Sequence, residues 1–229
     1  MKTSQIHTYK KSYKLRYHQK ILLHIIKKNS KKKTYGKILD IGCANGIFIK
    51  KFNKEFREFK CTGVDTSKDM INLAKKNKSK NSTFLIKDFM KYNMKSHFDI
   101  VIASGVLAFY DNYSKVINKM LSFLKKNSYL YIFGTFNSED IDTIVKFKNN
   151  YTNSTWEKGL NSFSKKRVSN FLKKKKYKFN FKKFDIPFNL KKKKNPILSY
   201  TLKSSKNRKI ILNGANIRME LFYLIIKKK

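Results

Sequence analysis

The stretch Lys37-Ile-Leu-Asp-Ile-Gly-Cys-Ala-Asn-Gly-Ile-Phe-Ile49 decides the fold. It begins with an apolar run typical of a buried strand, continues with glycines at 42 and 46, and ends on an apolar helix start. A strand, a glycine turn and a helix in this order form half of a βαβ unit. Such a turn lets the backbone approach a ligand, and the exposed N–H groups at the helix start favour anionic atoms.

The same alternation continues on both sides of this stretch. Apolar residues at helical spacing predict an amphipathic helix over 14–28, and Thr66 or Ser67 can cap a helix that runs through Ala74. Alternating strands and helices predict an α/β fold with a doubly wound, mostly parallel sheet. The remaining predicted elements are strands over 60–64, 84–86, 98–103 and 129–133, and a helical face at 116–124.

The alternation loosens beyond Gly134. A segment that leaves the fifth strand emerges at the carboxyl edge of the sheet, so we expect 136–162 to cover a ligand site there. We interpret 1–229 as a single domain, in which 135–229 supplies a cap segment and the closing strands. The patterns in this part predict helices over 138–145 and 164–172, strands over 177–188, 197–202, 208–212 and 217–226, and a hairpin turn at 204–207.

Acidic residues are rare, at 14 in 229, yet three of them close three predicted strands. Asp40, Asp65 and Asp88 therefore share the carboxyl edge of one sheet, where open α/β folds bind ligands. Asp65, 19 residues after Gly46, is placed to accept hydrogen bonds from two ribose hydroxyls. Asp88 can accept a hydrogen bond from the exocyclic amine of a purine while the Phe89 ring packs on that purine. Asp40 can hold the glycine turn or pair with a cationic ligand group. Carboxylates at this edge favour a cationic nucleoside over the phosphates of a dinucleotide.

Four motifs in the first half resemble those of the class I S-adenosylmethionine (SAM)-dependent methyltransferases: 38–46, 63–67 with Met70, 87–89 and 98–104. The resemblance covers about 36–134, the cofactor-binding core, and implies a seven-stranded sheet closed by an antiparallel pair, with SAM as cofactor. It implies that Gly42, Ala44 and Gly46 border the methionyl part, although glycine is commonest where Ala44 stands. It also implies Asp65 at the ribose and Asp88 at the adenine. The other cofactor-binding candidates are Asp40, Thr66, Met70, Phe89 and Ser104.

Methyl transfer from an activated sulfonium requires mainly that the acceptor nucleophile is aligned with the methyl group and that water is excluded. The stretch 103–107 holds no Asp/Asn-Pro-Pro-aromatic element of the kind that grips a flipped adenine, and neither Cys43 nor Cys61 follows a proline. Adenine-N6 and cytosine-C5 methylation are therefore not expected, while other RNA positions stay open. We expect a small-molecule acceptor with an O, N or C nucleophile. The alternative is an RNA-binding protein or RNA methyltransferase with the same fold.

Three residues are candidates for catalytic roles on the acceptor side, and each has a structural alternative. His18 lies near the apolar face of the first helix, where a packing histidine is the commoner case. Tyr110 follows the fourth strand at the carboxyl edge, next to Asp111, which can instead cap a helix. Glu157 follows Trp156 in the irregular segment 155–164, which can line a substrate pocket or anchor to the core.

The chain carries 54 Lys and Arg against 14 Asp and Glu, a formal charge of +40. All but five of these basic residues are lysines, and Asn, Ile and Phe are also frequent, as codons rich in A and T would dictate. Nucleic-acid interfaces favour arginine, so we interpret the charge first as compositional drift and expect only non-specific nucleic-acid binding. The lysine runs 173–176 and 191–194 are expected to be solvated ends of elements.

Several protein classes are excluded by simple counts. The two cysteines show no Cys-x-x-Cys spacing, which excludes a disulfide scaffold and a zinc module, and no metal site is expected. The sequence holds no apolar run of about 18 residues, which a membrane span requires, and no secretory signal pattern. We therefore expect a cytoplasmic protein without a membrane partner; the sequence does not indicate an oligomeric state.

Overall fold

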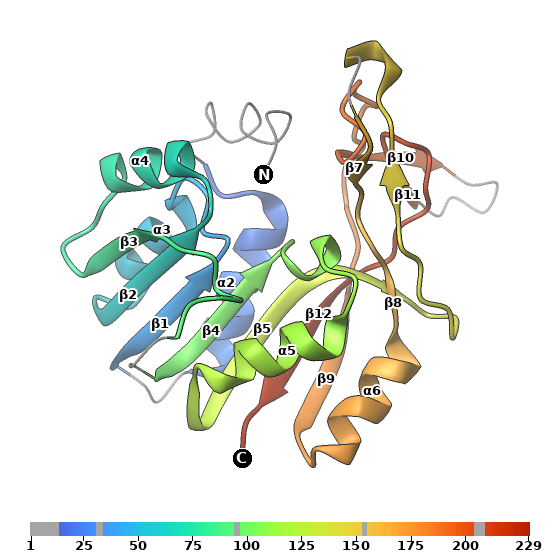
Figure 1. Ribbon diagram of the computed structural model, residues 1–229. Coiled ribbons are helices and arrows are strands. Elements are labelled where there is room, and N and C mark those ends of the chain that lie inside the picture. Colours follow the sequence, from blue (N-terminus) through green and yellow to red (C-terminus); the bar gives the residue numbers. More distant parts are fainter. Residues whose placement is uncertain (1–13, 31–33, 94–96, 153–154, 204–208) are drawn as a thin grey trace.

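The computed structural model describes residues 14–30, 34–93, 97–152, 155–203 and 209–229. Its centre is a sheet with the strand order β3-β2-β1-β4-β5-β12-β9 (Figure 1). The pairs among β1 to β5 are parallel, as the alternation of strands and helices predicts, and β12 runs antiparallel to both of its neighbours, as the resemblance implies. The strands are β1 (Tyr35–Ile41), β2 (Glu58–Asp65), β3 (Ser82–Ile86), β4 (Phe98–Ser104), β5 (Leu124–Asn137), β9 (Lys178–Phe184) and β12 (Leu221–Lys227). Outside this order, the short β8 (Phe163–Ser164) pairs with the end of β5.

The strand order reverses between β1 and β4. From β1 the chain runs outward to β3 and then returns to β4 on the other side of β1. Connections leave the carboxyl ends of these two strands in opposite directions, which opens a ligand crevice at this point in α/β sheets. The glycine turn after Ile41 and the loop after Ser104 border that crevice.

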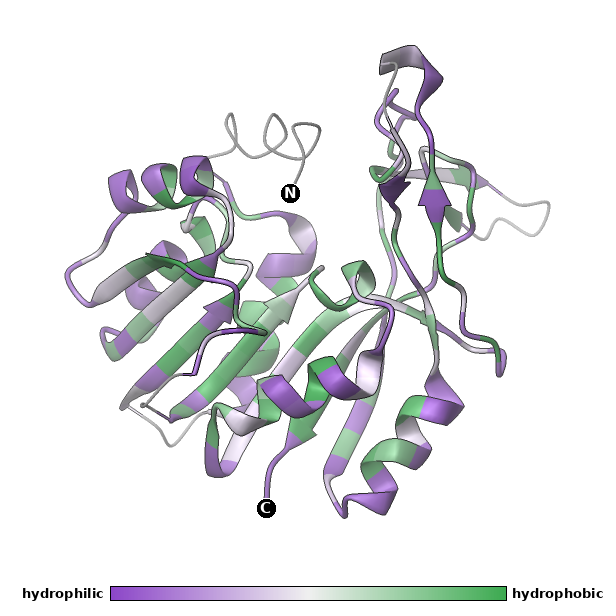
Figure 2. Cartoon of the chain, viewed as in Figure 1, coloured by the Kyte–Doolittle hydropathy of each residue, from purple (hydrophilic) through white to green (hydrophobic). Residues whose placement is uncertain are grey.

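Helices cover both faces of the sheet. On one face, α2 (Tyr17–Asn29), α3 (Ile47–Glu55) and α4 (Lys68–Lys76) share an apolar core with the sheet. On the other, α5 (Tyr113–Ser122) and α6 (Lys165–Lys174) pack on a second core. Figure 2 shows the strands largely hydrophobic and the outer sides of the helices hydrophilic.

The covering of both faces explains why the sequence of β1 is a continuous apolar run. Ile38 belongs to the core beneath α2 and α3, whereas Leu39 and Ile41 belong to the core beneath α5. Side chains alternate along a strand, so Asp40 points to the same face as Ile38. Its carboxyl group is consequently buried, at 4% exposure.

Two small sheets rise beyond the carboxyl edge of the central sheet, at the upper right of Figure 1. One pairs β6 (Lys146–Phe147) with β7 (Glu157–Lys158), and the other pairs β10 (Ser199–Lys203) with β11 (Lys209–Asn213). The second is the predicted hairpin; its turn at 204–207 lies outside the described residues. The short 3₁₀ helix η2 (Asn150–Thr152) lies between β6 and β7 in the chain, and another, η1 (Leu107–Phe109), follows β4.

The predicted helix over 138–145 is wrong. Its N-terminal part is a loop, and Thr143 bridges Ser162. Two aspartates of this loop instead bind Ser164, the residue that caps α6: Asp142 accepts a hydrogen bond from the Ser164 N–H at 2.8 Å, and Asp140 accepts from the Ser164 hydroxyl at 2.7 Å. These bonds hold the start of α6. Two predicted strands are also shorter than expected, since β9 ends at Phe184 and β12 begins at Leu221.

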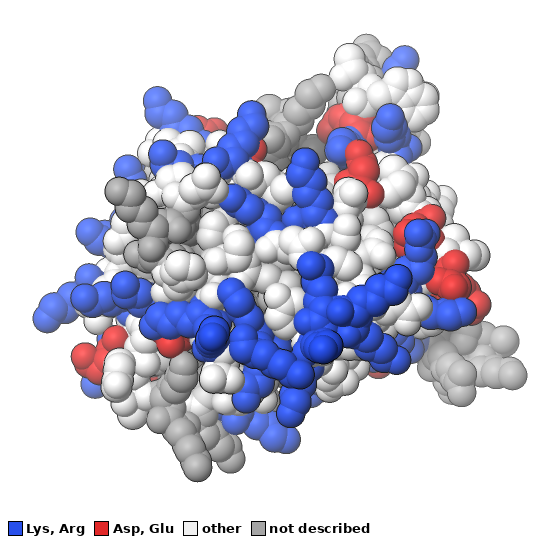
Figure 3. Space-filling model, turned by 60° about the horizontal axis from the view of Figure 1, so that its bottom comes forward, with Lys and Arg blue, Asp and Glu red and all other residues white. Residues whose placement is uncertain are grey.

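Basic side chains dominate the face shown in Figure 3, which brings forward the side where the C-terminus lies in Figure 1. The lysine runs 173–176 and 191–194 are exposed throughout, as expected of solvated ends. Across the described residues, none of the helices combines the length and the apolar character needed to cross a bilayer.

Candidate active site

The glycine turn between β1 and α3 has the conformation that its residues predict. Gly42 and Gly46 both have φ +71°, and a Cβ on Gly42 would come within 2.6 Å of the Val106 side chain. The Gly42 N–H donates to the Val64 carbonyl at 2.8 Å, which ties the turn to β2. Ala44 also adopts a left-handed backbone, with φ 47°. This conformation explains why glycine is favoured at that position.

Asp65 is fixed by two backbone donors. Its Oδ2 accepts from the Ala44 N–H at 3.0 Å, and its Oδ1 accepts from the Ser67 N–H at 2.9 Å. A carboxylate offers about four acceptor positions, so each oxygen keeps capacity for a ligand hydroxyl. Ser67 in turn caps α4 by accepting from the Met70 N–H at 3.3 Å. The carboxylate is thus held rigidly at the end of β2.

Asp40 lies behind the glycine turn. It borders a small cavity of about 20 Å³, together with His18, Gly42 and Ser104. Burial, and secondarily the charge of Asp65, raises the pKa of Asp40 to about 8. A nearby cationic ligand group would favour its ionised form.

A cavity of about 1140 Å³ opens at the carboxyl edge of the sheet. Of the predicted cofactor residues, it is lined by Gly42, Ala44, Asp65, Thr66, Phe89 and Ser104. Gly105, with φ +74°, has no atom within 4 Å of the position that a Cβ would take, so the backbone there faces open space. The turn, the fixed carboxylate and this open glycine fit a nucleoside cofactor such as SAM.

Four predicted cofactor residues do not line this cavity: Asp40, which lies behind the glycine turn, and Gly46, Met70 and Asp88. Gly46 immediately precedes α3, and a Cβ there would collide with Phe84, while Met70 is a core residue at 1% exposure. Asp88 accepts from the Met90 N–H at 2.9 Å through Oδ1. Its charge lies close enough to raise the pKa of Tyr110, although burial is the larger cause of that shift to about 12.

The three catalytic candidates all line the cavity. The His18 ring stacks on Phe133, with centroids 4.5 Å apart and planes 5° from parallel. Burial, and then the charge of Arg16, lowers the pKa of His18 to about 3, so the ring is neutral and a weak base. Tyr110 packs edge-on against Phe89 at 5.6 Å. Glu157 belongs to β7, which pairs with β6; both strands lie in the segment that follows β5.

The segment after β5 lines the cavity with some, but not all, of the residues that its sequence offers. Trp156 lines the cavity and is 69% exposed, so it is not a core anchor. Asn161, which the same segment supplies, is 1% exposed and lies outside the cavity lining. Asp111 does not cap α5, because Asn112 takes that position; instead Asp111 pairs with Lys158 at 2.8 Å.

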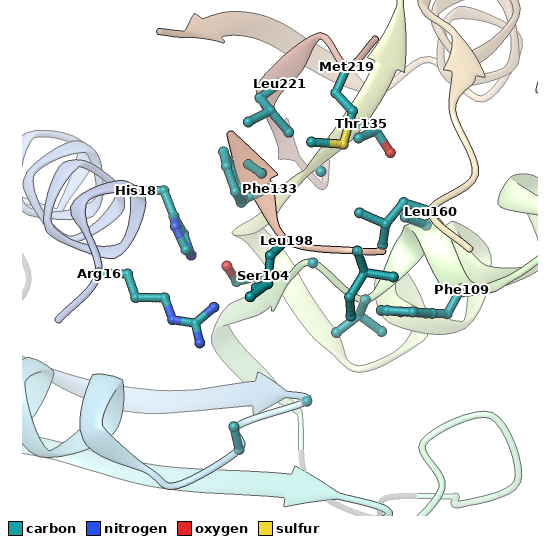
Figure 4. A pocket seen from close by; sticks show the side chains of 18 of the residues that line it. Arg16, His18, Ser104, Phe109, Phe133, Thr135, Leu160, Leu198, Met219 and Leu221 are labelled. Atoms are coloured by element: carbon teal, nitrogen blue, oxygen red, sulfur yellow. The ribbon is translucent and has the colours of Figure 1, made fainter. Parts of the chain in front are cut away.

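The half of the cavity away from the glycine turn is mainly apolar (Figure 4). The sequence does not distinguish these residues from core residues, because apolar side chains that line a cavity follow the same pattern. Arg16, at the start of α2, was also missed, although arginine is scarce in this chain. Residues that Figure 4 labels in this half include Phe109, Phe133, Thr135, Leu160, Leu198, Met219 and Leu221.

Comparisons with known proteins agree with this geometry. A family model described as a methyltransferase domain matches residues 32–207. Malonyl-[acyl-carrier protein] O-methyltransferase 1 of Ilyobacter polytropus is 32% identical over 95 residues, which cover 41% of this chain and 35% of that protein. The Bacillus cereus malonyl-[acyl-carrier protein] O-methyltransferase is 27% identical over 119 residues, covering 52% and 44%. This chain thus spans less than half the length of these curated relatives.

Solved structures resemble the chain over nearly its whole length. The YcgJ protein of Bacillus subtilis has a TM-score of 0.62 at 12% identity and covers 93% of this chain and 99% of its own. The Burkholderia thailandensis 1,6-didemethyltoxoflavin-N1-methyltransferase, bound to its substrate and S-adenosylhomocysteine, has a TM-score of 0.59 at 13% identity, covering 99% and 84%. At these identities the likeness shows the fold alone.

The strand order, the glycine turn and the acid at the end of β2 define a class I methyltransferase fold. With the family match over 32–207, the chain belongs to the methyltransferase domain family, whose class I members use SAM as cofactor.

Proposed function

We propose that this chain transfers the methyl group of SAM to a small-molecule acceptor. The observation that carries the proposal is the single cavity of about 1140 Å³, which joins the glycine turn and Asp65 to an apolar chamber. Pockets for one drug-sized ligand span roughly 300–1,000 Å³. The larger volume supports two neighbouring ligands in one enclosure.

Particular residues would hold the cofactor. Asp65 would accept hydrogen bonds from the ribose hydroxyls with its remaining acceptor positions. The backbone of the turn at Gly42 and Ala44 would border the methionyl part, and Asp40 would face the cationic groups from behind the turn. Phe89, Thr66 and Ser104 would complete the walls. The bound cofactor supplies an electrophilic methyl group, and the chain's residues align the acceptor and exclude water.

A carrier-linked acyl group is a second candidate acceptor. The curated relatives are named for methylation of malonyl-[acyl-carrier protein]. Lys191 and Lys193 are exposed and also line the cavity, so the cavity reaches the surface beside two cations. A tethered acyl group could enter at this point. Turnover of a malonyl thioester on a purified carrier protein, with none of unlinked acceptors, would favour this candidate.

The RNA alternative has no comparable support, since none of the relatives and structures named above is called an RNA methyltransferase. We therefore propose a two-part test. Calorimetry should show SAM binding with a Kd in the micromolar range, roughly −8 kcal/mol. Labelled SAM should then transfer its methyl group to the small-molecule fraction of a metabolite extract, while label in total RNA stays at background. Label that appears in RNA alone would contradict the proposal.

A further inference from the structure

The chamber is the apolar half of the cavity, away from the glycine turn, and side chains from several segments of the chain form it. Leu221, the first residue of β12, and Met219, two residues before it, enter the chamber at 8% and 6% exposure, and Leu198 enters from the segment before β10. Figure 4 shows these side chains around one hollow, with Phe133 and Thr135 of β5 on its wall. An acceptor that fills this hollow needs an apolar body, because a polar one would lose its hydration without a partner.

A cation stands at the inner end of the chamber. Arg16 is the residue that precedes α2. Its side chain points into the cavity, towards Ser104 (Figure 4). The first turn of α2 holds no acidic residue, and helix N-termini favour anions. Arginine binds carboxylates through a planar fork of donors.

The position of Arg16 is well fixed. Its N–H donates to Gln19 Oε1 at 3.0 Å, and its carbonyl accepts from the Lys20 N–H at 3.0 Å. The Tyr223 hydroxyl donates to the His18 carbonyl at 2.7 Å and so ties this turn to β12. The guanidinium therefore projects from a turn anchored to the sheet.

Two of the three candidate catalytic residues, His18 and Tyr110, are poorly suited to remove a proton from an acceptor. The low pKa of His18, about 3, makes it a weak base, and the pKa of Tyr110, about 12, keeps the phenol protonated. Apart from Asp65, the described acid in the cavity lining is Glu157, which lies on β7. An acceptor that is already anionic needs no base.

Resting on the proposed function, we propose that the acceptor is an apolar carboxylic acid, whose body occupies the hollow of Leu198, Met219 and Leu221 and whose carboxylate is received by Arg16. The product is the methyl ester. A carboxylate oxygen forms the new bond to the methyl carbon, the carbon–sulfur bond breaks, and its electron pair stays on sulfur as a neutral thioether. No proton moves in this step, and the negative charge of the acid cancels the positive charge of the sulfonium.

The experiment compares acceptors that share a body and differ in the reacting group. The full chain is incubated with labelled SAM and octanoate, decanoate or phenylacetate, and in parallel with the amines and alcohols of the same carbon skeletons. Mass spectrometry measures the methylated products. We expect methyl esters from the acids, at rates at least tenfold above those of the matched amines and alcohols. Faster methylation of an amine or alcohol than of its matched acid would overturn the proposal.

Two variants test the role of Arg16. In Arg16→Gln we expect the KM for the acid to rise at least tenfold, while the Kd for SAM stays within about threefold of the parent; Arg16→Lys should restore part of the loss. Lys20→Gln removes the same charge from an exposed position of α2 outside the cavity and should change neither value.

The remaining outcomes separate this proposal from the proposed function. If the Kd for SAM rises in Arg16→Gln while the KM for the acid does not, Arg16 serves the cofactor and the assignment is overturned. If the parent binds SAM but esterifies none of the acids, the acceptor class is wrong and the proposed function stands. If the parent does not bind SAM, the proposed function itself fails.

Discussion

The N–H of Ala44 donates a hydrogen bond to Oδ2 of Asp65 at 3.0 Å, and this bond joins the glycine turn after β1 to the end of β2. The same carboxylate accepts from the Ser67 N–H, so it also holds the start of α4. One acid therefore shapes the turn and presents its remaining acceptor positions to the cavity. Its structural role and its proposed role in binding the cofactor are therefore coupled.

Replacement of Asp65 should affect both roles. In Asp65→Ala the Kd for SAM should rise about 30-fold, or about 2 kcal/mol, because two charge-assisted hydrogen bonds to the ribose are lost. Calorimetry on the folded variant measures this, with thermal unfolding to follow the loss of the bonds to Ala44 and Ser67. Asp69→Ala, an exposed acid of α4, is the control and should bind SAM normally. Parent-like affinity in Asp65→Ala would remove Asp65 from the ribose site.

The buried carboxyl of Asp40 predicts a pH dependence of stability. Its pKa in the folded protein, about 8, lies above the ordinary 3.8, so between these values the folded state binds more protons than the unfolded chain. The contribution of Asp40 to the free energy of unfolding should therefore fall as pH rises through this window, by up to about 1.4 kcal/mol per unit. Urea unfolding at pH 5, 6.5 and 8 should show this slope in the parent and a weaker one in Asp40→Asn. Equal slopes would show that Asp40 is ionised throughout.

Asn161 should be a structural residue. Its side chain accepts from the Val145 N–H at 2.9 Å and donates to the Tyr110 carbonyl and to Asp111 Oδ1, each at 3.0 Å. Asn161→Ala leaves the buried Val145 N–H and the part-buried Tyr110 carbonyl without this partner and should lower the free energy of unfolding by about 3 kcal/mol.

The matched comparison is Glu157→Gln, which changes a residue of the cavity lining in the same segment. It should leave the free energy of unfolding within about 0.5 kcal/mol of the parent. If both variants unfold like the parent, the segment is not held by the Asn161 contacts.

The charge of +40 predicts loose binding of RNA. Because lysines supply a field without reading bases, the affinity should show no sequence preference and should fall steeply between 50 and 200 mM salt, by roughly 10³-fold or more if six or more phosphates are contacted. Fluorescence anisotropy with two unrelated oligonucleotides measures both properties. A tenfold preference for one sequence at 150 mM salt would restore the RNA alternative.

The sequence by itself determined the alternation of strands and helices, the mostly parallel sheet that this alternation implies, and the place of the glycine turn. These features depend on local rules: apolar runs mark strands buried on both faces, and Gly42 and Gly46 mark left-handed backbone. The positions of Asp40 and Asp65 at strand ends follow from the same periodicity. Such signals lie within a few residues of the feature that they specify.

Only the tertiary structure decided which residues meet beyond the carboxyl edge. The stretch 138–145 looked like a helix, but Asp140 and Asp142 within it bind Ser164, which lies more than 20 residues further along the chain. Arg16, Leu198 and Met219 converge on one cavity from three distant segments. No local pattern distinguishes an apolar side chain that faces another side chain from one that faces a hollow. That difference is set by packing between elements, and so the acceptor chamber became visible only in the folded chain.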